Sequence, residues 1–600
     1  MAWKWHISGV VIFVIIHLTY GQCPKECKCL RSQQVECSGR DVVEIPHSIP
    51  QNIRGLSLIN TEVTELQDGV LENMTALLAL KIEKSELSTI EPNAFNNLIS
   101  LRILSLMNNK LHDLPAGLFR DLGKLESLFL SNNMLGQIHP SLFLPLLNVK
   151  DLNLLGNNLR SIPRGTLDQM SGLTKLNIAK NNLTRLHPKT LEKVTKLQTL
   201  RLNENQIKEI PEGLLNTLTS LQEFAIQSNQ ISQLFPGLFS NNPELQKAYL
   251  SNNKITSLPE GLFFNTPQIS KLTLFENAIK AIPTGVFGHL QKLKELWLYD
   301  NQLEKLVDNA FSNLTQLQLL VISRNQIHTI SPDAFGGLEE LQELSLHTNV
   351  LTTLHEDVLQ GLHKLENISL HTNKIDHLPA GVFRNMATLK NIQLQNNSLQ
   401  RLPEGIFDTV VNLDEVKLYS NPWKCDLQLL PLKSWISDHL NKLGNYSTVI
   451  CANPPFAGEP IAELNDQQLA SFISKSTTAP VMEYTTSMSE VSSTDAPFHF
   501  SKTTNLYKTT LKFSATTKAE ISDKDFTEET TPDSDDSEFD PTYVPPDDRE
   551  YRGNRLIGVV VAIIVLCCIA IVCTVVACIL YNKKKKNHVV LMRMKQQNEA

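Results

Sequence analysis

The sequence repeats itself every 24 residues, and this regularity limits the possible fold more than any other feature. The pattern L-x-x-L-x-L-x-x-N-x-L starts at Leu101 and returns every 24 residues, without an insertion, as far as Leu413. Weaker copies start at Ile53 and Leu77, where a hydroxyl residue replaces the asparagine. The interval from 53 to 413 holds fifteen complete repeats. A unit this short cannot bury a core alone, so the units must stack on one another as successive coils.

Two columns of residues explain how the coils would stack. Leucines at the fourth and sixth positions point inward from a short strand, and the asparagines after them form a buried ladder that satisfies the backbone. Eighteen residues after each start stands a leucine or one of the phenylalanines Phe95, Phe119, Phe143, Phe239, Phe263, Phe287, Phe311, Phe335, Phe383 and Phe407. This column is wider than the leucine side, so the stack should bend. The predicted fold is an α/β solenoid, a curved leucine-rich repeat horseshoe with a parallel concave β-sheet.

Cysteines mark both ends of the repeat array. The spacing C-x3-C-x-C-x7-C at Cys23, Cys27, Cys29 and Cys37 resembles the N-terminal cap of extracellular leucine-rich repeat proteins. The segment NPWKCDLQLLPLKSW and the later Cys451 resemble their C-terminal cap. Many such C-terminal caps carry four cysteines, whereas only two are present here. The resemblance therefore implies a single disulfide, Cys425–Cys451, in a cap held mainly by Trp423, Leu430 and Trp435.

The two ends of the chain indicate a membrane protein. Lys4 precedes an apolar stretch from Ile7 to Leu18, as in a secretory signal peptide with cleavage near Gly21, so the clustered cysteines should form disulfides rather than a metal site. The 26 residues Leu556–Tyr581 carry no charge, are long enough to cross a bilayer and are followed by four lysines. The expected organisation is a signal peptide (1–21), an N-terminal cap (22–52), fifteen repeats (53–412), a C-terminal cap (413–470), a disordered Ser/Thr-rich and acidic stalk (471–555), a transmembrane helix (556–581) and a cytoplasmic tail (582–600). The predicted location is the plasma membrane, single-pass type I, with the N-terminus extracellular.

The concave face offers a candidate binding site where the repeats carry aromatic residues. The third, fifth and seventh positions of each repeat should face outward, and in most repeats these positions are polar or small. In the segment LKELWLYDNQL, however, Trp297 and Tyr299 occupy them, while Leu293, Leu296 and Leu298 form the core face. The predicted ligand-binding residues are Tyr249, Phe275, Trp297 and Tyr299, with Lys247, Lys271, Glu295 and Arg324 at the rim together with Glu276 and Asp300; Leu319 and Val321 should extend this outward-facing surface.

An aromatic centre with a charged border is typical of a protein-binding hot spot. Two alternatives stay open: the rings are scattered aromatics without a function, or two copies of the chain cover each other there. Six Asn-x-Ser/Thr sequons, at Asn73, Asn182, Asn313, Asn367, Asn396 and Asn445, are expected to carry glycans. A glycan at Asn367 would cover the concave face near it and restrict a protein ligand to the repeats before the fourteenth.

Other residues have both a functional and a plain interpretation. His347 and His371 occupy one column of successive repeats, which permits a metal pair or an acid sensor, but exposed histidines without a third ligand more often have neither role. Cys578 is a palmitoylation candidate, although cysteines in an apolar helix also serve as lipid-facing or helix-contact residues. Tyr543 and Tyr551 lie beside acidic residues and are candidates for sulfation.

The net charge and the motifs of the sequence argue against several classes of function. A net charge of -7 with 20% charged residues argues against nucleic-acid binding. No catalytic triad pattern, metal-spaced cluster or phosphate loop is present in the sequence, so neither an enzyme nor a cofactor is expected.

The chain resembles single-pass membrane members of the extracellular leucine-rich repeat family. The segments that carry the resemblance are CPKECKC, the uninterrupted repeats, KELWLYDNQ, SLHTNVL, NPWKCD and VVLMRMKQQNEA. The resemblance implies a cell-surface receptor that binds extracellular matrix proteins of the collagen, fibronectin and laminin classes and influences adhesion and migration. A co-receptor that modulates a signalling partner in the same membrane is the alternative. The oligomeric state is not predicted.

Overall fold

A computed structural model describes residues 23–30, 33–467 and 469. The predicted signal peptide, stalk, transmembrane helix and tail lie entirely outside these residues, as do Tyr543, Tyr551 and Cys578. No helix in the part of the chain that is described is long and apolar enough to cross a membrane.

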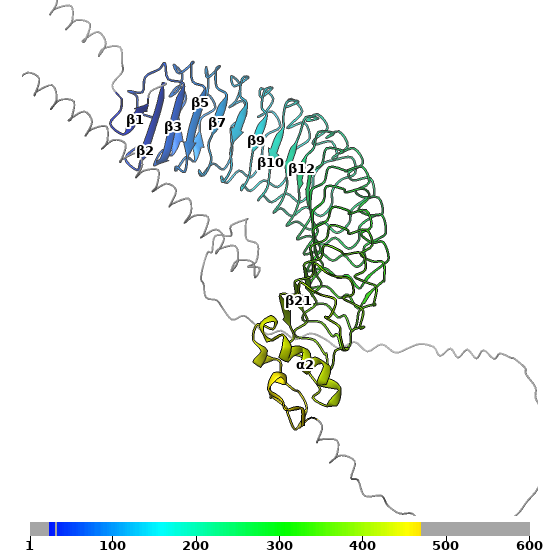
Figure 1. The fold of residues 1–600 in the computed structure, drawn as a ribbon. Helices are drawn as coiled ribbons and strands as arrows, with labels where there is room; N and C mark the ends of the chain where they lie inside the picture. The colour runs from blue at the N-terminus through cyan, green and yellow to red at the C-terminus, as the bar shows by residue number, and fades with distance from the viewer. Residues whose placement is uncertain (1–22, 31–32, 468, 470–600) are drawn as a thin grey trace, which may run out of the picture. The chain divides into compact units, whose positions relative to one another are not determined.

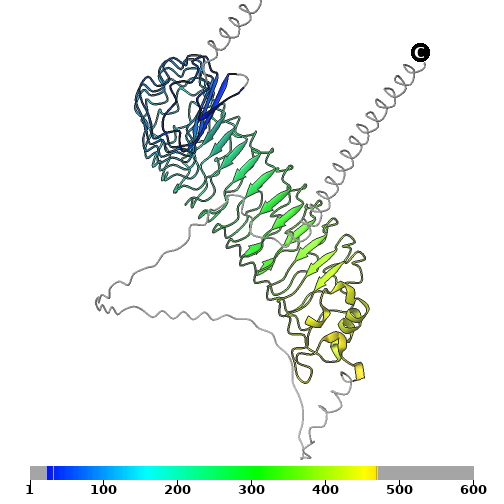
Figure 2. The ribbon, with the colours of Figure 1, turned by 90° about the vertical axis from the view of Figure 1, so that its left-hand side faces the viewer.

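The repeats form one continuous sheet of short strands that line the inner side of an arc (Figures 1 and 2). β1 pairs antiparallel with β2, and β2 starts a parallel ladder that runs to β22. From β3 onward each strand pairs with the residues 24 positions further along, as where Lys175 opposes Thr199. The strands are β1 (Cys27–Leu30), β2 (Gln34–Gly39), β3 (Gly55–Thr61), β5 (Ala79–Glu83), β7 (Ile103–Ser105), β8 (Ser127–Phe129), β9 (Asp151–Asn153), β10 (Lys175–Asn177), β11 (Thr199–Arg201), β12 (Glu223–Ala225), β13 (Lys247–Tyr249), β14 (Lys271–Thr273), β15 (Glu295–Trp297), β17 (Leu319–Val321), β19 (Glu343–Ser345), β20 (Asn367–Ser369), β21 (Asn391–Gln393) and β22 (Glu415–Lys417). The predicted parallel solenoid is confirmed.

The bend of the arc follows from the two columns. Strands in a sheet lie about 4.8 Å apart. On the opposite side of the coil, phenylalanine rings of successive repeats stack with centroids 5.7 to 6.4 Å apart. Because the phenylalanine side needs more room per repeat, the strands lie on the concave side, as the sequence predicted. Two pairs of short parallel strands lie outside the main sheet: β4 (Glu65–Leu66) with β6 (Thr89–Ile90), and β16 (Lys305–Leu306) with β18 (Thr329–Ile330).

The asparagine ladder holds the coils in register. Asn133 Nδ2 donates to the carbonyl oxygens of Leu106 and Leu130, at 2.9 and 3.0 Å, and Asn133 Oδ1 accepts from Leu111 N at 3.1 Å. The same three contacts recur in the repeats up to Asn421. In the first two repeats the hydroxyls of Thr61 and Ser85 bond each other at 2.8 Å instead. The ladder satisfies buried backbone groups that a leucine at these positions would leave unpaired.

The caps close both ends of the stack. Disulfides join Cys23 to Cys29 and Cys27 to Cys37 at the N-terminal end, and Cys425 to Cys451 at the C-terminal end, which confirms the predicted single bridge. The C-terminal cap contains η1 (Leu427–Leu429), α2 (Leu430–Asp438), η2 (Leu440–Lys442), η3 (Tyr446–Thr448) and η4 (Ile461–Glu463). Trp423 is fully buried and donates from Nε1 to the carbonyl oxygen of Leu418 at 3.1 Å. Trp435 of α2 contacts Phe407, the last ring of the phenylalanine column, with centroids 4.7 Å apart.

Candidate protein-binding site

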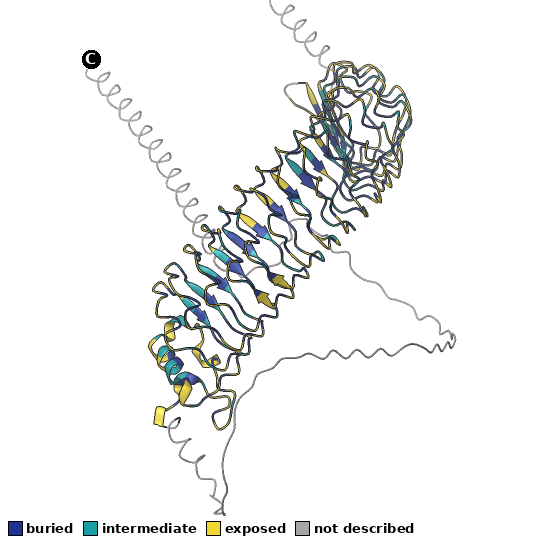
Figure 3. Cartoon of the chain, turned by 90° about the vertical axis from the view of Figure 1, so that its right-hand side faces the viewer, coloured by how far each residue is buried: buried dark blue, intermediate teal, exposed yellow. Residues whose placement is uncertain are grey.

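The strand that carries Trp297 has one buried and one outward face. Leu293, Leu296 and Leu298 are fully buried, whereas Trp297 and Tyr299 are half-buried on the concave surface of the sheet. The same alternation runs along the neighbouring strands, where buried residues alternate with intermediate and exposed ones (Figure 3). The two aromatic side chains are therefore outside the leucine core, and some of their ring surface is open to a ligand.

Four rings come together on this surface and are called here the aromatic patch: Tyr249, Phe275, Trp297 and Tyr299. The ladder pairs Tyr249 with Thr273 and Thr273 with Trp297, which brings residues 24 positions apart onto adjacent strands. The rings of Phe275 and Tyr299 stack with centroids 4.6 Å apart and planes 7° apart. Trp297 stands edge-on to Tyr299 at 6.3 Å and 78°. Offset-stacked and edge-to-face pairs are the favoured arrangements of aromatic rings, so Phe275, Trp297 and Tyr299 hold one another in position.

Charged side chains surround the rings on the strand side. Glu223 accepts from Arg201 Nε at 2.7 Å and lies 3.7 Å from Lys247 Nζ. Lys271 Nζ lies 5.7 Å from the centroid of the Tyr249 ring, within the range of a cation–π contact. Trp297 Nε1 donates to Glu295 Oε2 at 3.3 Å.

The opposite edge of the patch is formed by three residues with left-handed backbone conformation. Glu276, Asp300 and Arg324 have φ angles of 53°, 52° and 55°, and each directly precedes an asparagine of the ladder. Arg324 Nε pairs with Asp300 Oδ1 at 2.8 Å. Glu276 forms no salt bridge with any residue that the structure describes. This edge therefore carries two carboxylates and one cation.

The carboxylates and the partial burial of the rings change several pKa values. Burial, with Glu276 and Asp300 nearby, raises the pKa of the Tyr299 phenol to about 12. Glu276 is exposed at the surface, yet partial desolvation raises its pKa and Asp300 raises it further, while Arg324 opposes the shift. The pKa of Tyr249 is raised by burial and by Glu223. The patch is thus a partly dehydrated surface with negative potential at one edge.

Several residues that were predicted to face outward from the sheet are largely covered by their neighbours. Leu319 is buried, with 7% exposure, and the ladder places it between Glu295 and Glu343 of the adjacent strands; Val321 is half-buried. Some small or polar residues that were expected to face outward are buried as well, namely Ala179, Ser251, Thr273 and Gln395. Side chains on a closely spaced sheet are covered by their neighbours on adjacent strands, and the alternation of the pattern does not reveal this.

A second apolar group on the concave face was not predicted from the sequence. Ile103, Met107, Phe129 and Leu155 lie on or directly after β7, β8 and β9, and they are half-buried or, in the case of Ile103, 36% exposed. They are called here the N-terminal apolar group. Phe129 occupies the same column as Trp297, and Met107 the same column as Tyr299. A comparison of the third, fifth and seventh positions in every repeat would have identified these four residues.

The two histidines stack, with ring centroids 4.4 Å apart and planes 8° apart. Nδ1 of His347 contacts Thr348 Oγ1 at 3.0 Å, and Nδ1 of His371 contacts Thr372 Oγ1 at 3.1 Å. No group of three or more His, Cys, Asp or Glu side chains that could hold a metal ion occurs among the residues described. The predicted closeness of the rings is confirmed, and a metal site receives no support from their surroundings.

The sequons differ in their accessibility. Asn73, Asn182, Asn396 and Asn445 are exposed, while Asn313 and Asn367 are half-buried. Asn367 lies in β20 on the concave face, where its Oδ1 accepts from Asn391 Nδ2 at 2.6 Å. Modification at these positions remains a prediction.

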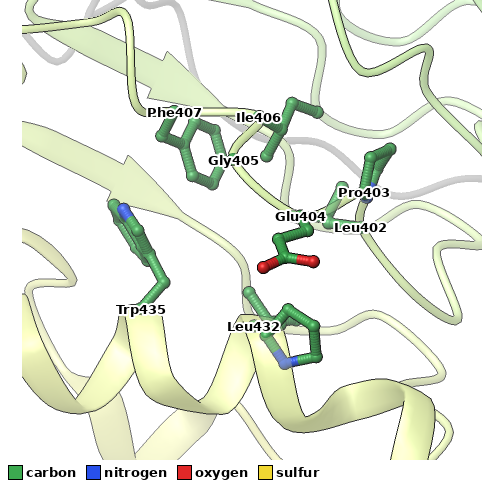
Figure 4. Close-up of a pocket in the computed structure, with 9 residues that line it drawn as sticks. Leu402, Pro403, Glu404, Gly405, Ile406, Phe407, Leu432 and Trp435 are labelled. Atoms are coloured by element: carbon green, nitrogen blue, oxygen red, sulfur yellow. The ribbon is translucent and has the colours of Figure 1, made fainter.

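A small recess of about 20 Å³ lies between α2 and the last repeat (Figure 4). It is lined by Leu402, Pro403, Glu404, Gly405, Ile406, Phe407, Pro431, Leu432 and Trp435. Small-molecule sites usually enclose about 300 to 1,000 Å³. The recess belongs to the packing between the cap and the repeats and is not the site we consider.

Comparisons with known proteins agree with this architecture. The family model described as "Leucine rich repeat" matches residues 51–111, 99–159, 147–207, 171–231, 219–279, 267–327, 315–375 and 363–422. Leucine-rich repeat-containing protein 15 of Homo sapiens is 48% identical over 71 residues, which are 12% of this chain and 12% of that protein. Platelet glycoprotein V of Mus musculus is 36% identical over 81 residues, 13% of this chain and 14% of that protein. The chain thus matches only a small part of the length of these relatives.

Two solved structures share the fold over most of the described residues. The plant peptide hormone receptor RGFR1 in complex with RGF2 is similar with a TM-score of 0.51 and 27% identity, over 64% of this chain and 62% of that chain. The Toll–Spatzle complex from Drosophila, in its glycosylated form, has a TM-score of 0.51 and 20% identity, over 73% of this chain and 72% of that chain, and shows the likeness of fold alone.

Proposed function

This chain belongs to the leucine-rich repeat family, and from that premise we propose that it is a cell-surface adhesion receptor that binds extracellular matrix proteins. The proposed ligands are proteins of the collagen, fibronectin and laminin classes, bound on the concave face at the aromatic patch. The disulfide caps and the extracellular relatives make it a secreted or cell-surface protein. Its anchoring by a single membrane span with an extracellular N-terminus is part of the proposal.

The aromatic patch is the observation that carries this proposal. Hot spots of protein interfaces are enriched in Trp, Tyr and Arg, and their centre is apolar with a polar border. Trp297, Tyr299 and Phe275 supply such a centre, and Lys247, Lys271, Glu295 and Arg324 supply the border. Half-buried rings that contact one another lose little side-chain freedom when a partner covers them, so their apolar area contributes efficiently to affinity.

The family also favours a protein ligand. Leucine-rich repeat proteins are scaffolds that bind protein partners and are typically non-catalytic, and one solved relative in fold is a receptor in complex with a peptide hormone. The assignment to matrix proteins rests on the resemblance of the quoted motifs to the family of leucine-rich repeat-containing protein 15. A co-receptor for a membrane partner is the second proposal, and the four cysteines within Leu556–Tyr581 favour it slightly, because they offer contacts to another helix.

Adhesion of cells that express the full-length chain tests the main proposal. Cells should attach to at least one of collagen, fibronectin and laminin, and Trp297→Ala combined with Tyr299→Ala should abolish the attachment. The matched control is Phe129→Ala combined with Leu155→Ala, which removes concave apolar side chains from the N-terminal apolar group. Surface expression of both variants is measured with an antibody. Normal adhesion by the first variant would contradict the proposed site, and proximity labelling that recovers one membrane protein without any matrix attachment would favour the co-receptor.

A further inference from the structure

Glu276 is a carboxylate on this surface without a salt bridge to any described residue. It lies beside the stacked pair of Phe275 and Tyr299, and no described cation is within salt-bridge distance of it. The nearest carboxylate, Asp300, already holds Arg324. Burial and Asp300 both disfavour the charged form of Glu276, which is an arrangement that an additional cation from outside the chain would relieve.

The repeat itself shows how the chain compensates a carboxylate at this position when no ligand is needed. Glu204 occupies the same column three repeats earlier, also with a left-handed backbone (φ 54°). Its Oε2 lies 3.5 Å from Nζ of Lys180, the residue at the same position of the preceding repeat. The corresponding neighbour of Glu276 is Asn252, which is uncharged. The register that pairs Lys180 with Glu204 therefore leaves Glu276 without a cation on that side.

The aromatic pair beside Glu276 stands between small residues. In the column of Phe275 and Tyr299, the preceding residue is Ser251 and the following residue is Ser323, with 4% and 3% exposure. Two short, buried side chains thus flank the ring pair, and the open ring surface of Phe275 and Tyr299 is what remains for a partner. The ring of Tyr249 already carries Lys271, so a cation over an aromatic ring is a contact that this surface makes within the chain itself.

We propose that the aromatic patch binds an arginine side chain of the protein partner, with the guanidinium stacked on the Phe275–Tyr299 ring pair and paired with the Glu276 carboxylate. The inference rests on the proposed function and adds the chemistry of the anchor residue. Arginine fits better than lysine because its planar guanidinium stacks on aromatic rings and donates two parallel hydrogen bonds to one carboxylate. The Trp297 side chain, fixed edge-on to Tyr299, forms a wall against the aliphatic part of the arginine.

Labelled peptides test this assignment without knowledge of the natural ligand. The probes are a fluorescein-labelled glycine peptide with three arginines, the same peptide with citrulline, which keeps the shape without the charge, and the same peptide with lysine. Their binding to the full-length chain in lipid nanodiscs is measured by fluorescence anisotropy. The arginine peptide should bind about tenfold more tightly than the citrulline peptide and more tightly than the lysine peptide. Equal binding of arginine and citrulline peptides, or of arginine and lysine peptides, would overturn the assignment.

Two matched variants locate the binding. Glu276→Gln should weaken the arginine peptide about tenfold and leave the citrulline peptide unchanged, because only the guanidinium pairs with the carboxylate. Glu204→Gln removes an equal charge from the same column and should leave both affinities unchanged. An equal loss in both variants would mean nonspecific attraction to an acidic protein and would overturn the proposal. The proposal would also be overturned if a second copy of the chain covers the patch. Light scattering would detect this as a dimer that Trp297→Ala dissociates.

Matrix proteins whose arginines are blocked with cyclohexanedione separate this inference from the proposed function. If adhesion needs Trp297 and Tyr299 but survives arginine modification and Glu276→Gln, the arginine anchor is wrong and the adhesion site stands. If the arginine peptide binds at Glu276 but no matrix protein supports adhesion, the anchor stands and the matrix function is wrong.

Discussion

Two regions of the concave sheet carry apolar side chains in the same columns, yet they differ in how their charges are arranged. In the N-terminal apolar group, Glu126 lies between Arg102 and Lys150, with Lys150 Nζ at 2.9 Å, and the two cations hold its pKa below the usual range. In the aromatic patch, Glu276 has no such partner and its pKa is raised. The same scaffold thus surrounds one carboxylate, Glu126, with two cations (a closed charge network) and leaves another, Glu276, without a salt-bridge partner (an incomplete network). An incomplete network beside aromatic rings is what we expect of a binding site.

The largest difference between the two regions should appear when one ring is removed from each. Trp297→Ala should weaken binding of a matrix protein about 30-fold, which corresponds to about 2 kcal/mol, the value typical of a hot-spot residue. Phe129→Ala, in the same column, should change the affinity less than twofold. Surface plasmon resonance with the full-length chain in nanodiscs measures both. Similar losses for the two variants would show that the whole concave face, and not the patch, contributes the affinity.

A smaller effect is expected when the aromatic patch is given the charge arrangement of the closed network. Asn252→Lys places a lysine one repeat before Glu276, as Lys180 stands before Glu204. The new ammonium should pair with Glu276 and compete with the partner, which lowers the affinity for the arginine peptide about fivefold. Asn252→Gln, which adds length without charge, is the control and should bind as the unmodified chain does. Unchanged binding after Asn252→Lys would show that Glu276 is not a contact.

Much of this fold could be predicted because every repeat has the same pattern of apolar residues and asparagine. The 24-residue period set the register, the leucines set the inner face, and the phenylalanine column set the direction of the bend. The outward position of Trp297 followed from alternation alone. The burial of Leu319 was not predicted because it depends on neighbours on the adjacent strands, which a pattern within one repeat does not encode.

The charges of the site could be predicted only as neighbours, not as pairs. The sequence placed Glu276, Asp300 and Arg324 at the rim of the rings, but the choice of Asp300 as the partner of Arg324 depends on side-chain positions. Likewise, a comparison of the outward positions in every repeat would have identified Phe129 and Met107. The pairing of Glu126 with both Arg102 and Lys150 becomes visible only when these side chains are located in space.

The carboxylates of Glu276 and Glu126 should change the stability of the fold in opposite directions. The folded-state pKa of Glu276 is raised above 4.5, so its charged form costs stability at neutral pH, and Glu276→Gln should raise the melting temperature at pH 7. The pKa of Glu126 is lowered, so its charged form stabilises above pH 4.5, and Glu126→Gln should lower the melting temperature at pH 7. Both differences should vanish in acid: that of Glu276 below pH 4.5, and that of Glu126 only as the pH falls through its lowered folded-state pKa. Calorimetry from pH 3 to pH 8 measures the curves, and shifts of equal sign would contradict the contrast between the two regions.

The smallest effect concerns the phenol of Tyr299. Because its pKa is raised to about 12, only about one-tenth of it should be ionised at pH 11, where an ordinary tyrosine is almost fully ionised. Difference absorbance near the phenolate band, with Tyr299→Phe as the reference, isolates this residue. Full ionisation of Tyr299 at pH 11 would mean that the ring is hydrated and that the patch is not the partly buried surface described above.

Radical footprinting of the full-length chain, with and without a bound matrix protein, tests the central claim most directly. Hydroxyl radicals oxidise accessible aromatic and sulfur side chains, and mass spectrometry reports the rate at each residue. We predict that a bound partner protects Trp297, Tyr299 and Phe275, while Met107 and Phe129 are oxidised at the same rate as in the free chain. Protection of Met107 and Phe129 without protection of Trp297 would contradict the proposed site.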